Sequence, residues 1–322
     1  MGQVLSEPIT EKDSESGSDK RVAYGVSSMQ GWRVSMEDAH AAVLNLVNKK
    51  NESPEHLSFF AVYDGHGGSS TAEFAGKNLH DLLAEQPALA AKDYPQALKD
   101  SYLSCDRSLL NHPQLENDPS GCTATSILLS DTLICAANAG DSRTVLCSRG
   151  YAKPLSFDHK PQNEFEKLRI DRAGGWVESG RVNGNLALSR ALGDFSFKRS
   201  ANLPPEEQIV SAVPEIIEHT ITADDEFVVL ACDGIWDCMT NQQVVEFVRR
   251  SVAEGQDLDK ICENIMNNCL APASDLSGNG CDNMTVVIVA LLQGHSISEW
   301  YQMVKERVEA KDGPAASLEA IE

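Results

Sequence analysis

The order of strand-like and helical segments is the feature that most restricts the fold of this 322-residue chain. Helical patterns come in pairs between groups of strand-like segments, and they do not follow every strand. A doubly wound parallel sheet needs a helix after nearly every strand, so this order argues against one. The sequence therefore predicts an α+β fold built from layers of antiparallel sheet, without internal repeats.

Hydrophobic periodicity and turn residues define the expected elements. Strands are expected at 22–28, 40–47, 58–63, 122–130, 132–138, 142–147, 209–212, 226–231 and 284–291. Helices are expected at 69–85, 95–111, 162–173, 241–253, 257–269 and 295–311. The polar residues 1–20 predict a flexible arm. We place the main domain at 21–294, with a loop-rich, flap-like excursion at 162–208, and a C-terminal helix and tail at 295–322.

The net charge and the cysteines of the chain indicate which partners it can bind and in which cellular compartment it occurs. A formal net charge of −21 repels phosphate backbones, so we expect no nucleic-acid partner. The same charge would suit a protein that gathers divalent cations, or one that simply stays soluble. Nine scattered cysteines without a C-x-x-C pair indicate reduced core residues of an intracellular protein. None is followed six positions later by arginine, so a cysteine-based phosphate-binding loop is not expected.

The first six residues, MGQVLS, fit the pattern for attachment of myristate to Gly2. One acyl chain binds membranes weakly, on the order of 10⁴ M⁻¹, and neither a nearby cysteine nor a basic cluster supplies a second anchor. The longest apolar run, 286–292, is far below the roughly 20 residues that span a bilayer. We therefore expect a cytoplasmic monomer that contacts membranes transiently if Gly2 is myristoylated, and the sequence leaves the nucleus open.

Acidic residues stand at the ends of the apolar runs. The run FFAVYDGHGG at 59–68, for example, passes from a strand-like segment directly into an acid, a histidine and three glycines. The acids placed in this way are Glu37, Asp38, Asp64, Asp141, Asp233, Asp237 and Asp282. A lone Asp-Gly after a strand is usually only a turn, but the repetition is harder to explain in that way. Because the ends of neighbouring strands meet at one edge of a sheet, we expect these acids to converge.

Carboxylates that converge in a poorly solvated site repel each other unless they are protonated or bind cations. A ligand set made only of oxygen selects Mg²⁺ or Mn²⁺, and the lack of a Cys/His cluster argues against zinc. Two such ions, roughly 3.5–4 Å apart, are typical of phosphate-ester hydrolases. Gly65 would let its carbonyl approach an ion closely, and Gly67 and Gly68 would permit a tight turn into the next helix.

Seven motifs, from about Val22 to Leu292, resemble those of the metal-dependent type 2C protein serine/threonine phosphatases. They are SMQGWRVSMEDAH, FFAVYDGHGG, SGCTAT, NAGDSR, SRALGD, LACDGIWD and DNMTVV, in the order and approximate spacing of that family. One departure is Cys122, where many relatives carry a small Ser or Gly. The resemblance implies a four-layer αββα sandwich of two central antiparallel β-sheets flanked by helices, with the metals at one end and the main domain as the catalytic domain.

The resemblance also implies a ligand set for two ions. Asp64 would bridge them. Glu37 and the carbonyl of Gly65 would complete the protein ligands of one ion, and Asp233 and Asp282 those of the other.

Further residues stand at matching positions of the family motifs. Asp38 would orient metal-bound water. Asp141 and Asp237 would hold a third, weaker ion that some members bind, and Asp194 would support the water network.

Two side chains would act on the substrate. Arg33 resembles the phosphate-binding arginine of the family, and its planar fork suits two phosphoryl oxygens. The alternative is a surface ion pair with Glu37 or Asp38. His66 resembles the proposed general acid, which would protonate the serine or threonine oxygen as it leaves. The alternative is a structural histidine.

The resemblance implies hydrolysis of phosphoserine and phosphothreonine on proteins by direct attack of a water activated by two Mg²⁺ or Mn²⁺ ions. The alternative is a catalytically inactive scaffold that binds phosphoproteins. A nucleotide-binding transferase is disfavoured because the sequence lacks the glycine-rich phosphate loops. The basic residues of the excursion would help to select phosphoproteins, or they form a solvated face: Lys167, Arg169, Arg172, Lys198 and Arg199.

Overall fold

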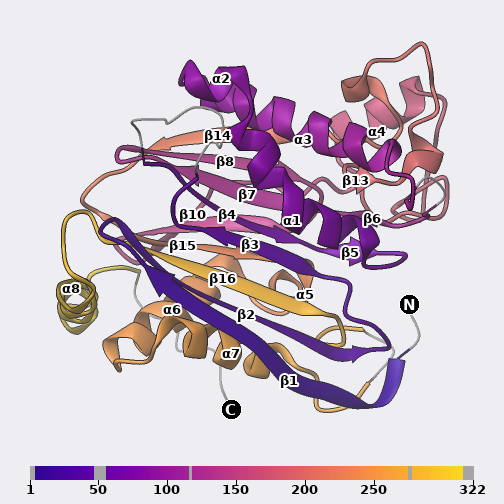
Figure 1. Ribbon diagram of the computed structural model, residues 1–322. Helices are drawn as coiled ribbons and strands as arrows, with labels where there is room; N and C mark the ends of the chain where they lie inside the picture. Colours follow the sequence, from indigo (N-terminus) through magenta and orange to yellow (C-terminus); the bar gives the residue numbers. More distant parts are fainter. Residues whose placement is uncertain (1–3, 47–55, 116–117, 275–277, 315–322) are drawn as a thin grey trace.

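The computed structural model describes residues 4–46, 56–115, 118–274 and 278–314. Two antiparallel sheets pack face to face, and helices cover both outer faces (Figure 1). This is the four-layer αββα sandwich, so the expected fold class is confirmed. Among the described residues, no helix has the length and the apolar character needed to cross a bilayer. Gly2 and the end of the tail lie outside the described residues.

Each sheet has its own strand order. The first sheet runs β1 (Val4–Ser18), β2 (Val22–Arg33), β16 (Met284–Leu291), β15 (Asp225–Ala231), β9 (Arg143–Ser148) and β10 (Tyr151–Pro154). The second runs β14 (Glu215–Thr220), β8 (Leu133–Ala139), β7 (Ala124–Leu129), β4 (Ser58–Tyr63) and β3 (Ala39–Val43). The strands β4, β7 and β16 are buried along their whole length, because one face meets the other sheet and the opposite face meets helices. This explains their nearly continuous apolar sequences.

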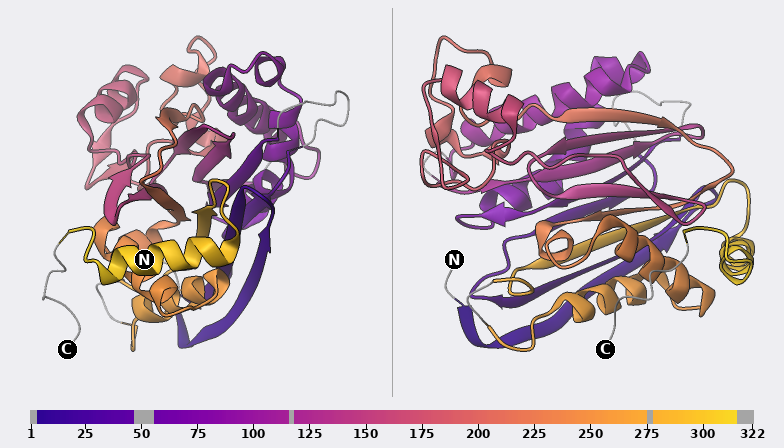
Figure 2. Two further views of the ribbon diagram at one scale, coloured as in Figure 1. Left: turned by 90° about the vertical axis from the view of Figure 1, so that its left-hand side faces the viewer. Right: turned by 180° about the vertical axis from the view of Figure 1, so that it is seen from behind.

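The helices form the two outer layers (Figures 1 and 2). Those on the first sheet are α5 (Asp233–Trp236), α6 (Asn241–Ala253), α7 (Leu258–Cys269) and α8 (Ile297–Glu309). Those on the second sheet are α1 (Ser70–Ala84), α2 (Pro87–Ala90) and α3 (Tyr94–Leu110). Helices α6 and α8 each begin with a capping box, at Thr240 and Ser296, which fixes the observed start of each helix.

The hydrophobic core has three main parts that follow from these layers. One lies between the first sheet and its helices and includes Trp300, which α8 contributes. A second lies between the other sheet and α1 and α3. The third lies between the two sheets, where Phe60, Ile127 and Val287 are fully buried.

The expectation of a flexible arm at residues 1–20 is wrong for the part that the structure describes. Residues 4–18 form β1, which pairs with β2 in antiparallel register from Val4 opposite Arg33 to Ser18 opposite Ala23. The side chain of Ser14 lies 2.8 Å from that of Ser27 and donates to Glu263 of α7 at 3.1 Å. Because β1 is an edge strand without a fully buried residue, its sequence carries no apolar alternation.

Two other strand predictions differ from the structure. No strand forms at 209–212, where Ser211 makes only an isolated parallel bridge to Arg190; the edge strand β14 lies further on. The strand expected at 122–130 is divided at Thr123 into β6 (Gly121–Cys122) and β7. The break matters because β6 belongs to a separate small sheet, in the order β13 (Leu192–Gly193), β6, β5 (Gly65–His66).

The excursion at 162–208 packs beside α3 at one end of the sandwich (Figure 1). It contains α4 (Glu164–Arg172), a hairpin of β11 (Val177–Glu178) and β12 (Arg181–Val182), and two short 3₁₀ turns at Phe195–Phe197 and Pro205–Glu207. A small core of its own includes Ile170, Val182 and Leu188. The buried Glu166 accepts from Arg169 and Arg190, both at 2.7 Å, and this network ties α4 to the segment that returns to the main body.

Candidate active site

The buried strand β4 delivers Asp64 to one end of the sandwich. Directly after it, β5 pairs with β6, so that Gly65 lies opposite Cys122 and His66 opposite Gly121. Two hydrogen bonds to Thr123 fix the backbone of Asp64. The Thr123 amide donates to the Asp64 carbonyl at 2.8 Å, and the Asp64 amide donates to the Thr123 hydroxyl at 3.2 Å. The turn therefore has little freedom to move the carboxylate.

Acids that are far apart in the sequence converge around Asp64. Burial raises the pKa of Asp64 well above its usual range, and the charges of Asp233, Asp38, Asp282 and Asp141 raise it further. The pKa of Asp233 is raised in the same way, by burial and then by Asp141, Asp282 and Asp237. The aspartates therefore lie close enough to interact at one end of the sandwich, which is the convergence that the sequence predicts.

Glu37 is oriented toward the same turn. Its carboxylate accepts from the Ser35 hydroxyl at 2.7 Å and from the Gly68 amide at 3.0 Å. A Cβ on Gly65 would lie 2.1 Å from the backbone carbonyl oxygen of Glu37. Gly65 is therefore needed for the close approach of these two segments, a reason that the sequence alone did not reveal.

The two carboxylate oxygens of Asp38 differ in their hydrogen bonding. Thr285 donates to its Oδ2 at 2.7 Å, whereas Oδ1 is buried and has no hydrogen-bond partner among the described residues. Burial and the charge of Asp282 raise the pKa of Asp38 to about 7, although the hydrogen bond from Thr285 opposes them. A ligand atom of Asp38, one of Asp64 and one of Cys232 lie within 4.8 Å of one another. An orphaned carboxylate oxygen beside a second carboxylate fits a hard divalent cation.

Cys232 is a site residue that the sequence analysis did not single out, although it directly precedes Asp233. Burial raises the pKa of its thiol well above the usual range, and Asp38 and Asp64 add to the shift. The neutral thiol is therefore favoured, and only the thiolate would suit zinc. The expected donors therefore remain carboxylate and carbonyl oxygens.

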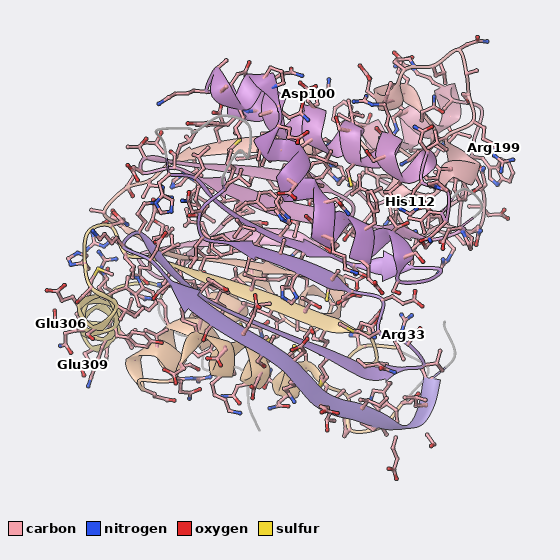
Figure 3. The ribbon with its side chains drawn as sticks, in the orientation of Figure 1. Arg33, Asp100, His112, Arg199, Glu306 and Glu309 are labelled. Carbon is pink, nitrogen blue, oxygen red and sulfur yellow. The ribbon has the colours of Figure 1, made fainter. Side chains whose placement is uncertain are left out.

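Arg33 pairs with Asp282, at 2.5 Å between Nη2 and Oδ2. The expected alternative, an ion pair with Glu37 or Asp38, is not formed. The Arg33 side chain is 39% exposed and lines a cleft of about 310 Å³ together with Glu37, Gly65 and His66. Figure 3 shows Arg33 at the end of the sandwich that carries the site. The guanidinium can thus contact a bound molecule while it remains anchored.

His66 is held by Asp194, with 2.7 Å between Nε2 and Oδ2. A Cβ on Gly121 would lie 2.2 Å from that carboxylate oxygen and 2.6 Å from the imidazole nitrogen, so only glycine leaves room for the pair. Burial alone would lower the pKa of His66, but the hydrogen bond and the charge of Asp194 outweigh it and raise the pKa. Asp194 therefore positions the histidine, a contact that the sequence did not predict, and its support of a water network stays a prediction.

Asp141 and Asp237 come together around a lysine. The Asp237 amide donates to the Asp233 carbonyl at 2.8 Å, one turn earlier in α5. The ammonium of Lys160 lies 2.6 Å from Oδ2 of Asp141 and interacts electrostatically with Asp233 and Asp237. Lys160 was not expected from the sequence, because a lysine in a loop is usually solvated.

The chain matches known proteins along most of its length. The model of the family described as "Protein phosphatase 2C" matches residues 22–277. Protein phosphatase 2C homolog 2 of Hypocrea jecorina is 58% identical over 325 residues, which cover 100% of this chain and 74% of that protein. Protein phosphatase 2C homolog 3 of Schizosaccharomyces pombe is also 58% identical, over 100% of this chain and 77% of that protein.

Solved structures agree with the fold. A phosphatase from Toxoplasma gondii superposes with a TM-score of 0.74 at 26% identity, over 88% of this chain and 96% of that one. A Caenorhabditis elegans sex-determining protein gives 0.72 at 26% identity, over 90% of this chain and 69% of that one.

Fold, acidic site and sequence similarity together define a phosphatase. The chain belongs to the protein phosphatase 2C family, and the resemblance drawn from its motifs is confirmed. It is therefore a protein serine/threonine phosphatase.

Proposed function

We propose that this phosphatase hydrolyses phosphoserine and phosphothreonine on proteins by direct attack of water, at a centre of two Mg²⁺ or Mn²⁺ ions. The convergence of carboxylates around Asp64 carries the proposal: ligand atoms of Asp38 and Asp64 lie within 4.8 Å of each other, and neighbouring aspartates raise the pKa of Asp64 and Asp233. When it is ionised, such a cluster is destabilising unless cations neutralise it.

The proposed ligands follow from the positions of the acids. Asp64 would be shared by both ions, Glu37 and the Gly65 carbonyl would serve one of them, and Asp233 and Asp282 would serve the other. When bound, the ions supply charge that activates water and neutralises phosphoryl oxygens. Asp141 and Asp237 would hold a third, weaker ion, next to Lys160.

The cleft residues would act on the phosphoryl group and on the leaving oxygen. Arg33 would donate to phosphoryl oxygens, with Asp282 holding its guanidinium in place. His66 would give a proton to the leaving serine or threonine oxygen from Nδ1, because Nε2 faces Asp194. Asp38 would orient the attacking water with its free Oδ1.

The test is hydrolysis of a simple aryl phosphate by the full chain with Mn²⁺, and then with excess chelator. We expect turnover with Mn²⁺ that chelator removes and added Mn²⁺ restores. Retained binding of a phosphoprotein with no turnover under either condition would instead favour the inactive scaffold. Turnover that persists in chelator would contradict the metal centre.

We further propose phosphoprotein substrates, no nucleic-acid partner, a monomer and a cytoplasmic location, with membrane contact through N-myristoyl Gly2. The net charge of −21 supports the absence of a nucleic-acid partner. Intact mass spectrometry of the protein from its own cells tests the acylation, since myristate adds a fixed mass to the N-terminus. Light scattering tests the monomer.

A further inference from the structure

A second pocket opens beside the active site, between α3 and the excursion. Its volume is about 360 Å³, and we call it the flap pocket. The residues that matter here are Arg107 and Leu110 of α3 and Phe195, Lys198, Arg199 and Leu203 of the excursion. The proposed roles of the catalytic residues use none of these side chains.

Two of the cations at the flap pocket have no ion-pair partner among the residues that the structure describes. Lys198 is bound internally, to Asp106 at 2.7 Å and to the Ala191 carbonyl at 2.9 Å. Arg107 and Arg199 are exposed, and within the described part of the chain neither has an ion-pair partner; the guanidinium of Arg107 donates only to Ser104 at 2.9 Å. Two exposed arginines without a described ion-pair partner are unusual at one pocket of a protein with a net charge of −21.

The other cations of the excursion are arranged differently. Lys167 pairs with Asp171, and Arg169 with Glu166. Of the five basic residues that were expected to help select phosphoproteins or to form a solvated face, Lys198 and Arg199 line this pocket, and only Arg199 has no ion-pair partner there among the described residues. Arg172 is exposed as well, but it does not line the pocket.

Apolar surface lies between the cations. Leu110 is 50% exposed, and Phe195 and Leu203 are half-buried. The ammonium of Lys198 sits 5.4 Å from the centre of the Phe195 ring, which keeps that ring against the pocket. An apolar floor edged by arginines matches an extended peptide that carries an apolar side chain next to acidic ones.

The flap pocket is linked to the catalytic histidine through adjacent residues. Phe195, in its wall, directly follows Asp194, the buried carboxylate that holds His66. In Figure 3, Arg199 and Arg33 lie at the same end of the molecule. A substrate whose phosphorylated residue occupies the cleft beside His66 would thus have its flanking chain within reach of this pocket.

We propose that the flap pocket binds an acidic segment of the phosphoprotein substrate that flanks the phosphorylated residue, and that Arg107 and Arg199 select for it. This proposal rests on the proposed function. It adds a preference for substrates with aspartate, glutamate or a second phosphate near the scissile one.

The test compares phosphothreonine peptides that differ only in flanking residues, with Asp and Glu in one series and Asn and Gln in the other. The acidic pair is moved stepwise along the peptide, on both sides of the phosphothreonine. The full chain, Arg107→Ala, Arg199→Ala, the double variant and the control Arg172→Ala are assayed with each peptide and with an aryl phosphate. Aryl phosphate turnover shows that each variant is folded and active.

We expect each arginine substitution to lower kcat/KM for the best acidic peptide by roughly two- to fivefold, and less at high salt. The neutral peptides, the aryl phosphate and Arg172→Ala should be unaffected. Equal kcat/KM on acidic and neutral peptides in the unaltered protein would overturn the proposal, and so would an equal loss in Arg172→Ala. Failure of the proposed function is a separate result, in which no substrate is turned over with Mn²⁺.

Discussion

At the residue scale, Gly121 matters because it leaves the space in which the side chains of His66 and Asp194 make contact. His66 and Asp194 are 128 residues apart, and their side chains meet at the place where any Cβ on Gly121 would lie. Asp194 is also one of the few non-glycine residues with a positive φ, 52°, and it is buried. Backbone strain at a buried carboxylate is typical of functional sites, and here the strained residue positions the imidazole.

Replacing Asp194 with asparagine should mainly affect substrates with poor leaving groups. Asp194 raises the pKa of His66, so its loss lowers that pKa and moves the protonated form of the imidazole to lower pH. We expect kcat for a phosphothreonine peptide to fall by roughly 10²-fold at neutral pH and to recover partly at lower pH, with a much smaller loss for an aryl phosphate. Steady-state kinetics across pH on both substrates measure this.

The matched comparison is His66→Ala, alone and combined with Asp194→Asn. Because Asp194 acts through His66, the double variant should be no slower than His66→Ala. Independent, multiplying losses would show that Asp194 has a role of its own in catalysis. Equal losses on both substrates would count against His66 as the acid.

At the scale of elements, the N-terminal segment contributes the strand β1 to the first sheet. It covers the edge of β2, whose ladder would otherwise end in unpaired backbone groups. A chain that begins at Asp19 should therefore have a lower Tm and should associate at high concentration. Calorimetry and light scattering measure both effects. An unchanged Tm and a monomeric truncated protein would mean that β1 contributes nothing to stability.

The loop between β10 and α4 contains a buried histidine that should respond to pH. Burial lowers the pKa of His159 to about 4, from an ordinary 6.5, and its ring accepts from the Gly140 amide at 3.3 Å. The folded protein therefore resists protonation that the unfolded chain accepts. The stability due to neutral His159 is complete above pH 6.5 and is lost as pH falls from 6.5 to 4, by roughly 3 kcal/mol.

A His159→Gln variant removes this titration and keeps a hydrogen-bond acceptor. We expect its free energy of unfolding to fall less steeply between pH 6.5 and 4 than that of the unaltered protein. Urea titrations at each pH, with chelator present throughout, give the two slopes. If the free energy of unfolding changes with pH equally in the two proteins, His159 is protonated equally in the folded and the unfolded chain.

Burial explains which elements and site residues could be predicted from the sequence. The strands β4 and β16 are covered on both faces, so their apolar runs were clear, and the acids that follow or precede them mark the site. The edge strands β1 and β14 lack such runs because solvent covers much of their surface. Local sequence patterns do not show which distant residues make contact. Neither the contact of Asp194 with His66 nor that of Lys160 with Asp141 could therefore be predicted from the sequence.

At the scale of the whole molecule, the acidic site should couple metal binding to stability. Asp64 and Asp233 are half-buried among like charges, and their raised pKa values mean that ionising them at neutral pH opposes folding. Cations that bind only the folded protein should reverse this cost. At a free Mn²⁺ concentration 100 times the Kd, the expected gain is about 2.7 kcal/mol.

Thermal unfolding of the full chain, with chelator and with Mn²⁺, measures that coupling without any substrate. For a chain of 322 residues we expect Mn²⁺ to raise Tm by roughly 4 °C. In Asp64→Asn the repulsion is relieved and the shared ligand is lost, so Tm in chelator should rise and the response to Mn²⁺ should largely disappear. The control Asp171→Asn removes an exposed carboxylate that pairs with Lys167, and it should keep the full response. An equal rise in Tm for all three proteins would mean that Mn²⁺ binds elsewhere on the acidic surface and does not need Asp64.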